Sequence, residues 1–134
     1  MPTVLADVLV FKPKTARTGL VQIFNRLTTT DATTTEIINL SVSEGESIGF
    51  QGLLVGRQSD LSDQIVANIW GGARRAAAGN VTLTGTPTVT ILESAAGTNA
   101  TVTADTTNQT VDINVIGIVS ETWTWEFFGT YFKV

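Results

Sequence analysis

The chain of 134 residues contains no cysteine and no histidine. The lack of cysteine excludes disulfide bonds and thiolate catalysis, and the lack of both residues excludes zinc sites with nitrogen or sulfur ligands. Acid–base catalysis by an imidazole near neutral pH is excluded as well. We therefore expect no cofactor and no metal, and we look for function in packing and in the surface.

Charge is also scarce, because only 15% of the residues are charged and 43% are apolar, whereas a typical domain has about 25% charged residues. A subunit that covers part of its surface with neighbours fits this composition. No stretch of about 18 apolar residues is present, so we expect no membrane span. The first residues lack a basic region before their apolar run, unlike a secretory signal, which indicates synthesis in the cytoplasm.

The few charges are distributed unevenly along the chain. Residues 1–26 contain Lys12, Lys14, Arg17 and Arg26 against Asp7, a net charge of +3, so the remainder carries −7. This predicts a basic N-terminal arm or strand segment, residues 1–27, that contacts an acidic surface on a capsid or another subunit. An ordinary solvated loop is the alternative. Nucleic acid is not expected, because no aromatic residues are interleaved with these charges.

Period-two alternation of apolar residues, punctuated by glycine and turn residues, predicts an all-β chain. The length fits a single β-domain, which we place at residues 28–134 after the arm. We expect an antiparallel β-sandwich or jelly roll with about eight to ten short strands. The expected strands are residues 4–10, 20–27, 36–42, 48–57, 64–70, 81–84, 88–92, 100–104, 110–116 and 121–128.

Acidic residues offer two candidate sites, and a structural role is favoured for both. Asp105 and Asn108 with Asp112 contain the oxygen ligands that calcium prefers, but their spacing matches no ligand pattern, so we predict a turn. A second possibility is a pair of carboxylates for sugar hydrolysis. The candidate pairs for it are Glu44 with Glu46 and Glu121 with Glu126. Because the sequence shows no aromatic-lined cleft beside them, we expect no enzyme and no small-molecule substrate.

Aromatic residues gather near the end of the chain. Trp123, Trp125 and Phe127 alternate with polar residues, which predicts that they share one face of a strand and fill the core. A sugar-stacking platform is the alternative for these rings. Phe128 lies on the other face, and with Tyr131 and Phe132 it is expected to expose apolar surface that another subunit covers.

Four segments in order resemble a β-module of structural proteins in tailed-bacteriophage virions. They are residues 28–37 (TTTDATTTEI), 46–60 (ESIGFQGLLVGRQSD), 88–117 (TVTILESAAGTNATVTADTTNQTVDINVIG) and 120–128 (SETWTWEFF). Trp125 matches the tryptophan of the module's closing strand. Gln51, Gln58 and Thr124 stand where the module often has arginine, so an inter-subunit salt bridge is not carried over.

The resemblance implies a virion structural protein with a β-sandwich fold, assembled in the cytoplasm of a bacterial host. Because the module accounts for most of the chain and follows a basic segment, we expect a capsid decoration (cement) protein. It is expected to act as a homotrimer on the major capsid protein or another virion protein. The alternative is a tail-fibre or spike module that binds a host receptor or glycan.

Overall fold

The computed structural model describes residues 19–94 and 96–134, and these form nine β-strands. No helix occurs in this part of the chain, and hence none that could cross a membrane. The strands are β1 (Val21–Thr29), β2 (Thr35–Ser41), β3 (Glu46–Gln58), β4 (Gln64–Arg75), β5 (Val81–Leu83), β6 (Thr88–Glu93), β7 (Asn99–Asp105), β8 (Thr110–Ile116) and β9 (Trp123–Lys133).

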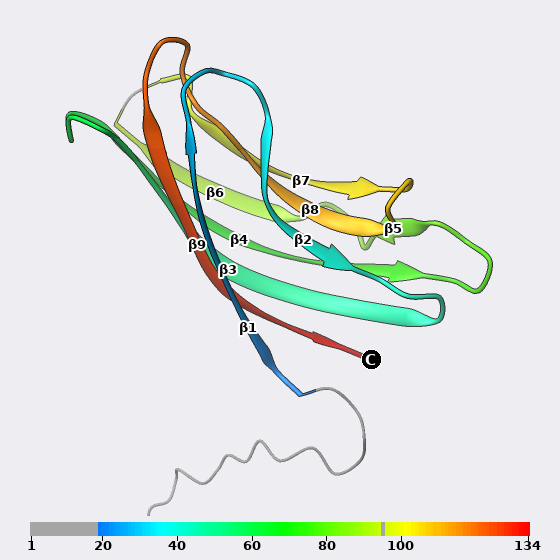
Figure 1. The fold of residues 1–134 in the computed structure, drawn as a ribbon. Helices are drawn as coiled ribbons and strands as arrows, with labels where there is room; N and C mark the ends of the chain where they lie inside the picture. Colours follow the sequence, from blue (N-terminus) through cyan, green and yellow to red (C-terminus); the bar gives the residue numbers. More distant parts are fainter. Residues whose placement is uncertain (1–18, 95) are drawn as a thin grey trace, which may run out of the picture.

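The strands form two antiparallel sheets that pack face to face, as Figure 1 shows. The larger sheet has six strands in the order β1-β9-β3-β4-β5, with β6 also paired to β4. The smaller sheet has three strands in the order β2-β8-β7. The chain passes from one sheet to the other between β1 and β2, β2 and β3, β6 and β7, and β8 and β9. The predicted antiparallel β-sandwich is confirmed.

The core lies between the two sheets and is filled by alternate residues of each strand. From the small sheet come Ile38, Leu40, Val111, Ile113 and Val115, among others. From the large sheet come aliphatic residues of β3 and β4 together with Trp123, Trp125 and Phe127, which are fully buried. The predicted core position of these three aromatic residues is confirmed.

Trp125 is held in place by contacts on several sides. Its ring stacks on Trp123 with 5.7 Å between centroids, and its Nε1 donates a hydrogen bond to the buried Thr29 hydroxyl at 2.9 Å. The ring lies against the backbone of Gly56, where a Cβ atom would come within 2.5 Å of Cε3 of Trp125. Glycine at this position of β3 therefore makes room for the indole.

The turn between β7 and β8 has the predicted chemistry. Oδ1 of Asp105 accepts hydrogen bonds from the backbone amides of Thr107 and Asn108, at 2.8 and 3.0 Å, and Oδ2 accepts one from the Asn108 side chain. The Asn108 amide, followed by the other donors, lowers the pKa of the Asp105 carboxyl. Asp105 is thus a turn residue. Asp112, in β8, accepts a hydrogen bond from the Thr110 hydroxyl.

Several predicted boundaries differ from the observed ones. The strand expected at residues 4–10 lies outside the described residues. β4 continues past Gly71 and Gly72 to Arg75, because β3 on one side and β5 on the other pair with that stretch. Arg74 and Arg75 are therefore strand residues, up to five positions beyond the expected end of this strand at residue 70. The division between residues 27 and 28 falls inside β1, which is an integral strand of the large sheet.

Candidate interaction surface

The outward side of the six-stranded sheet exposes a row of large apolar side chains. In the register of the sheet, Phe24 of β1 is paired with Phe128 of β9, and Phe128 is paired with Leu53 of β3. These three residues have 60%, 53% and 48% of their surface exposed, respectively. Three consecutive strands thus present an uninterrupted apolar row to solvent.

Neighbouring rows on the same side extend this surface. One contains Val55, Val66 and Leu92, which are paired in succession across β3, β4 and β6. Phe132 and Trp70 lie toward the other end of the sheet, and 57% of the Trp70 surface is exposed. We call this outward side of the large sheet the apolar face; it comprises Phe24, Leu53, Val55, Val66, Trp70, Leu92, Phe128 and Phe132.

The charged groups on this side include an ion pair in the row of Val55, because Val55 is paired with Glu126 and Glu126 with Arg26. Nε of Arg26 is 3.1 Å from Oε2 of Glu126 on the adjacent strand, and both side chains are about half exposed. Such an exposed pair adds at most about 1 kcal/mol to folding. Arg57 and Arg74 are exposed near the ends of β3 and β4. Gln51 is paired with Trp70 and Asn68 with Leu53, so uncharged amides that both donate and accept hydrogen bonds stand within the rows.

The apolar face is hollowed where glycine replaces a side chain. Phe132 is paired with Gly49, and Gly49 with Gly72, so the surface drops away beside the phenyl ring. A hollow of about 360 Å³ lies there, lined on its other sides by Gln51, Trp70 and Thr130, among others. A second hollow of about 290 Å³ lies beside Phe128. Protruding rings and adjacent hollows therefore alternate on one face.

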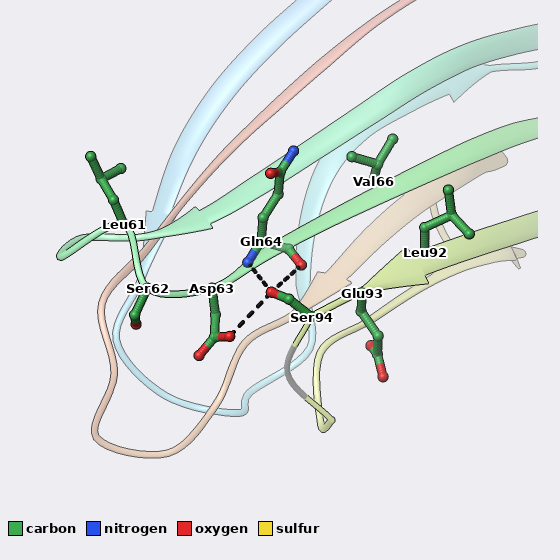
Figure 2. Close-up of a pocket in the computed structure, with 8 residues that line it drawn as sticks. All are labelled: Leu61, Ser62, Asp63, Gln64, Val66, Leu92, Glu93 and Ser94. Carbon is green, nitrogen blue, oxygen red and sulfur yellow. Dashed lines mark hydrogen bonds between the residues drawn. The ribbon is translucent and has the colours of Figure 1, made fainter.

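A third hollow, of about 460 Å³, lies at the edge of the apolar face (Figure 2). Val66 and Leu92 contribute the apolar wall that is shared with that face, and Leu61 stands beside it in the β3–β4 turn. On the polar side, the Ser94 hydroxyl accepts a hydrogen bond from the backbone N–H of Gln64 at 2.7 Å and donates one to Oδ1 of Asp63 at 3.1 Å. These polar groups join β6 to the start of β4.

The outward side of the three-stranded sheet has the opposite character. It contains Thr, Asn, Ser, Asp and Glu side chains and no large apolar residue except Ile116. Its side chains bond to one another: Thr110 donates to Asp112 at 2.6 Å, and Asn114 donates to Thr103 at 3.1 Å. We call it the polar face. The sandwich thus has one side suited to water and one suited to contact with protein.

The basic residues predicted as contacts do not form a cluster in the part of the chain that the structure describes. Lys12, Lys14 and Arg17 lie outside the described residues. Arg26 lies in β1 and is paired with Glu126, so its charge is already matched within the chain.

The aromatic residues predicted as contacts divide between two sides of β9. Phe128 and Phe132 are on the apolar face and half exposed. Tyr131 is on the opposite side, partly buried against the core, with the Lys133 ammonium 5.9 Å from its ring centre. The expectation that Tyr131 joins the exposed aromatics was wrong, because β9 continues regularly through Gly129 and preserves the alternation of side chains.

The four carboxylates considered for sugar hydrolysis each have a structural partner. Glu44 faces Arg75 at 3.6 Å, and Glu126 pairs with Arg26. Oε1 of Glu46 accepts a hydrogen bond from the Ser43 amide, which lowers the pKa of Glu46, and lies 3.4 Å from Lys133. Glu121 accepts a hydrogen bond from Nε1 of Trp123. Within residues 19–94 and 96–134, no group of three acidic residues is placed to hold a metal ion.

Most of the apolar face was missed by sequence reasoning. Phe24, Leu53 and Trp70 lie in three separate strands, and each alone is an unremarkable exposed apolar residue. The signal available was the strand alternation, which puts Phe24 opposite to the core-facing Ile23 and Leu27. Only the pairing of β1, β9 and β3 shows that these residues join.

Two solved structures are similar to this chain. The tailspike protein of Acinetobacter phage vB_ApiP_P1 matches 85% of this chain and 22% of its own, with 15% identity and a TM-score of 0.41. The tailspike protein of Acinetobacter baumannii phage AM24 matches 86% of this chain and 28% of its own, with 6% identity and a TM-score of 0.39. This chain therefore spans less than a third of either tailspike protein. No family model and no curated protein sequence matches it. At these TM-scores the likeness bears on neither the partners nor the activity of this chain.

Proposed function

We propose that this protein is a non-enzymatic structural module of a tailed-bacteriophage virion, of the tail-fibre or spike type, and that neighbouring subunits cover its apolar face. The observation that carries the proposal is the apolar face. A folded domain gains about 25 cal/mol for each Å² of apolar surface that an assembly removes from water. A module that is always surrounded by neighbours can carry such a surface without aggregating. We infer that the assembly is a phage virion from the resemblance of four segments of the chain to a module of phage virion proteins.

The polar side chains support a structural role. The four glutamates considered for sugar hydrolysis are each engaged by an arginine, a lysine, a backbone amide or an indole. Several side chains of the polar face bond to one another, as Thr110 does to Asp112 and Asn114 to Thr103. A host receptor or glycan is contacted by surfaces that remain exposed in the assembly.

Capsid decoration is the second candidate. It requires residues 1–27 to grip the shell with their basic side chains, as the sequence suggests. One of those side chains, Arg26, is held by Glu126 at 3.1 Å. In a tail module, the apolar face by itself provides the contact with neighbouring subunits. A decoration protein needs the N-terminal segment as well, because that segment is what grips the shell. We therefore place the tail-module proposal first.

Removing residues 1–18 separates the two candidates. Since all nine described strands lie in residues 21–133, we expect the shortened protein to fold, with an unchanged far-ultraviolet circular dichroism spectrum. The tail-module proposal predicts that the shortened protein is still incorporated into virions, with gold-labelled antibody on tails. Labelling on heads, together with loss of capsid co-sedimentation after the deletion, would replace this proposal with capsid decoration.

A further inference from the structure

We propose that the apolar face is covered by the same face of a second copy of this chain. This inference rests on the proposed function and names the partner for the surface that carries it. Three properties of the face support a second copy: its size, its charge and its shape.

The size of the face matches what a stable contact between two proteins requires. Five strands lie side by side across it, in the order β1, β9, β3, β4 and β6. They give a width of about 24 Å at about 4.8 Å between strands. The nine residues of β1 give a length of about 30 Å. The projected area is thus about 700 Å² per copy, or about 1,400 Å² for two, within the range of about 1,200–2,000 Å² for stable interfaces.

The charge of the face favours a partner with the same chemistry. Its central row, from Phe24 to Leu53, has no charged residue, so a strongly acidic or basic partner would bury charges that nothing there can pair with. The amides of Gln51 and Asn68 can bond to the same amides of another copy. Arg26 and Glu126 stand side by side with opposite sign, so each can face the other's equivalent across a symmetric contact.

The shape of the face provides both halves of a fitted contact. Phe128 and Phe132 protrude with half of their surface exposed, and a hollow lies next to each of them. The hollow at Phe132 exists because Gly49, which lines it, presents no side chain there. A second copy supplies protruding rings of the right kind for these hollows, and its own hollows accept the rings of the first.

The test is the native mass of the full chain, measured by light scattering during gel filtration over a range of concentrations up to tens of micromolar. We expect a mass of twice 14.2 kDa, because two copies that cover each other's apolar face leave no free face for a third chain. The variant Phe128→Asp is expected to weaken association by about 30-fold or more, because it puts an unpaired charge at the centre of the contact. Val119→Asp is the matched control, since Val119 is also more than half exposed but lies in the β8–β9 connection, away from the face. This control is expected to associate like the wild type.

A second variant guards against a folding defect in Phe128→Asp. A Cβ atom at Gly49 would have no atom within 4 Å, so Gly49→Leu fills the hollow without disturbing the single chain. We expect it to fold like the wild type and to associate at least about 10-fold more weakly. A monomeric wild type, or association that neither substitution changes, would overturn the inference.

The result of the association test does not depend on where the protein lies in the virion. A monomeric protein that still labels on virions, and loses its place there through Phe128→Asp, would keep the proposed function and assign the face to a different virion protein. A protein that associates through the face but is absent from virions would keep the inference and overturn the proposed function.

Discussion

Replacing Trp125 with alanine is expected to lower the free energy of unfolding by about 3–5 kcal/mol, the usual cost of deleting a buried tryptophan. The ring is completely buried, stacks on Trp123 and covers Gly56. Its loss leaves a cavity, and it also removes the hydrogen bond to Thr29, whose hydroxyl is itself buried. Urea unfolding followed by circular dichroism measures the change.

The comparison is best made in the Phe128→Asp background, because self-association would add to the apparent stability by mass action. Phe24→Ala in the same background is the matched control. It also deletes a large ring, but from the outward side of the neighbouring strand, so we expect a change of less than about 0.5 kcal/mol. Equal losses in both variants would contradict the assignment of one ring to the core and the other to the surface.

Replacing Gly56 with alanine is expected to destabilise the fold by about 1–3 kcal/mol or more, as overpacking of a filled core does. The added Cβ atom would lie 2.5 Å from Cε3 of Trp125 and 2.9 Å from Cγ2 of Ile65. Both neighbours are fully buried and have no room to move aside. The same urea unfolding experiment measures this effect.

Gly49→Ala in the same strand is the control for this prediction. Its Cβ atom would point outward into open space, so we expect a neutral or slightly stabilising change. Adding Trp125→Leu to Gly56→Ala should recover part of the loss, because the smaller side chain leaves space for the methyl group. If Gly56→Ala were as well tolerated as Gly49→Ala, the close packing of Trp125 on β3 would be wrong.

The fold was largely predictable because the sequence patterns that indicate it lie within single strands and turns. Alternation within each strand is visible in the sequence, so the β-sandwich and the buried Trp123, Trp125 and Phe127 could be predicted before any pairing was known. The turn at Asp105 was predictable for the same reason, since its hydrogen bonds reach only two or three residues along the chain.

Strand lengths were less predictable, because they depend on partners that are distant in sequence. Glycine at positions 71, 72 and 129 indicates a break when each is considered alone. In the sheet, β4 is held past Gly71 by β3 and β5, and β9 passes Gly129 between β1 and β3. The error at Tyr131 follows directly from the supposed break at Gly129.

The apolar face could be predicted only in part. Phe128 and Phe132 were found because they stand next to core residues on one strand. Phe24 joins them from about 100 positions earlier in the chain, and Leu53 from about 75 positions earlier, through register alone. These residues form one surface only because of the order of the strands in the sheet. The alternation of side chains within a single strand does not reveal that order.

The most direct test of the central claim uses Trp70 as a reporter. Of the three tryptophans, Trp70 is 57% exposed on the apolar face of the single chain, whereas Trp123 and Trp125 are fully buried. If a second copy covers the face, acrylamide will quench the fluorescence of the assembled wild type only weakly, and Phe128→Asp will restore strong quenching. Trp70→Phe provides the baseline from the two core tryptophans. Strong quenching of the wild type, equal to that of Phe128→Asp at every concentration, would show that the apolar face stays in water and would contradict the account.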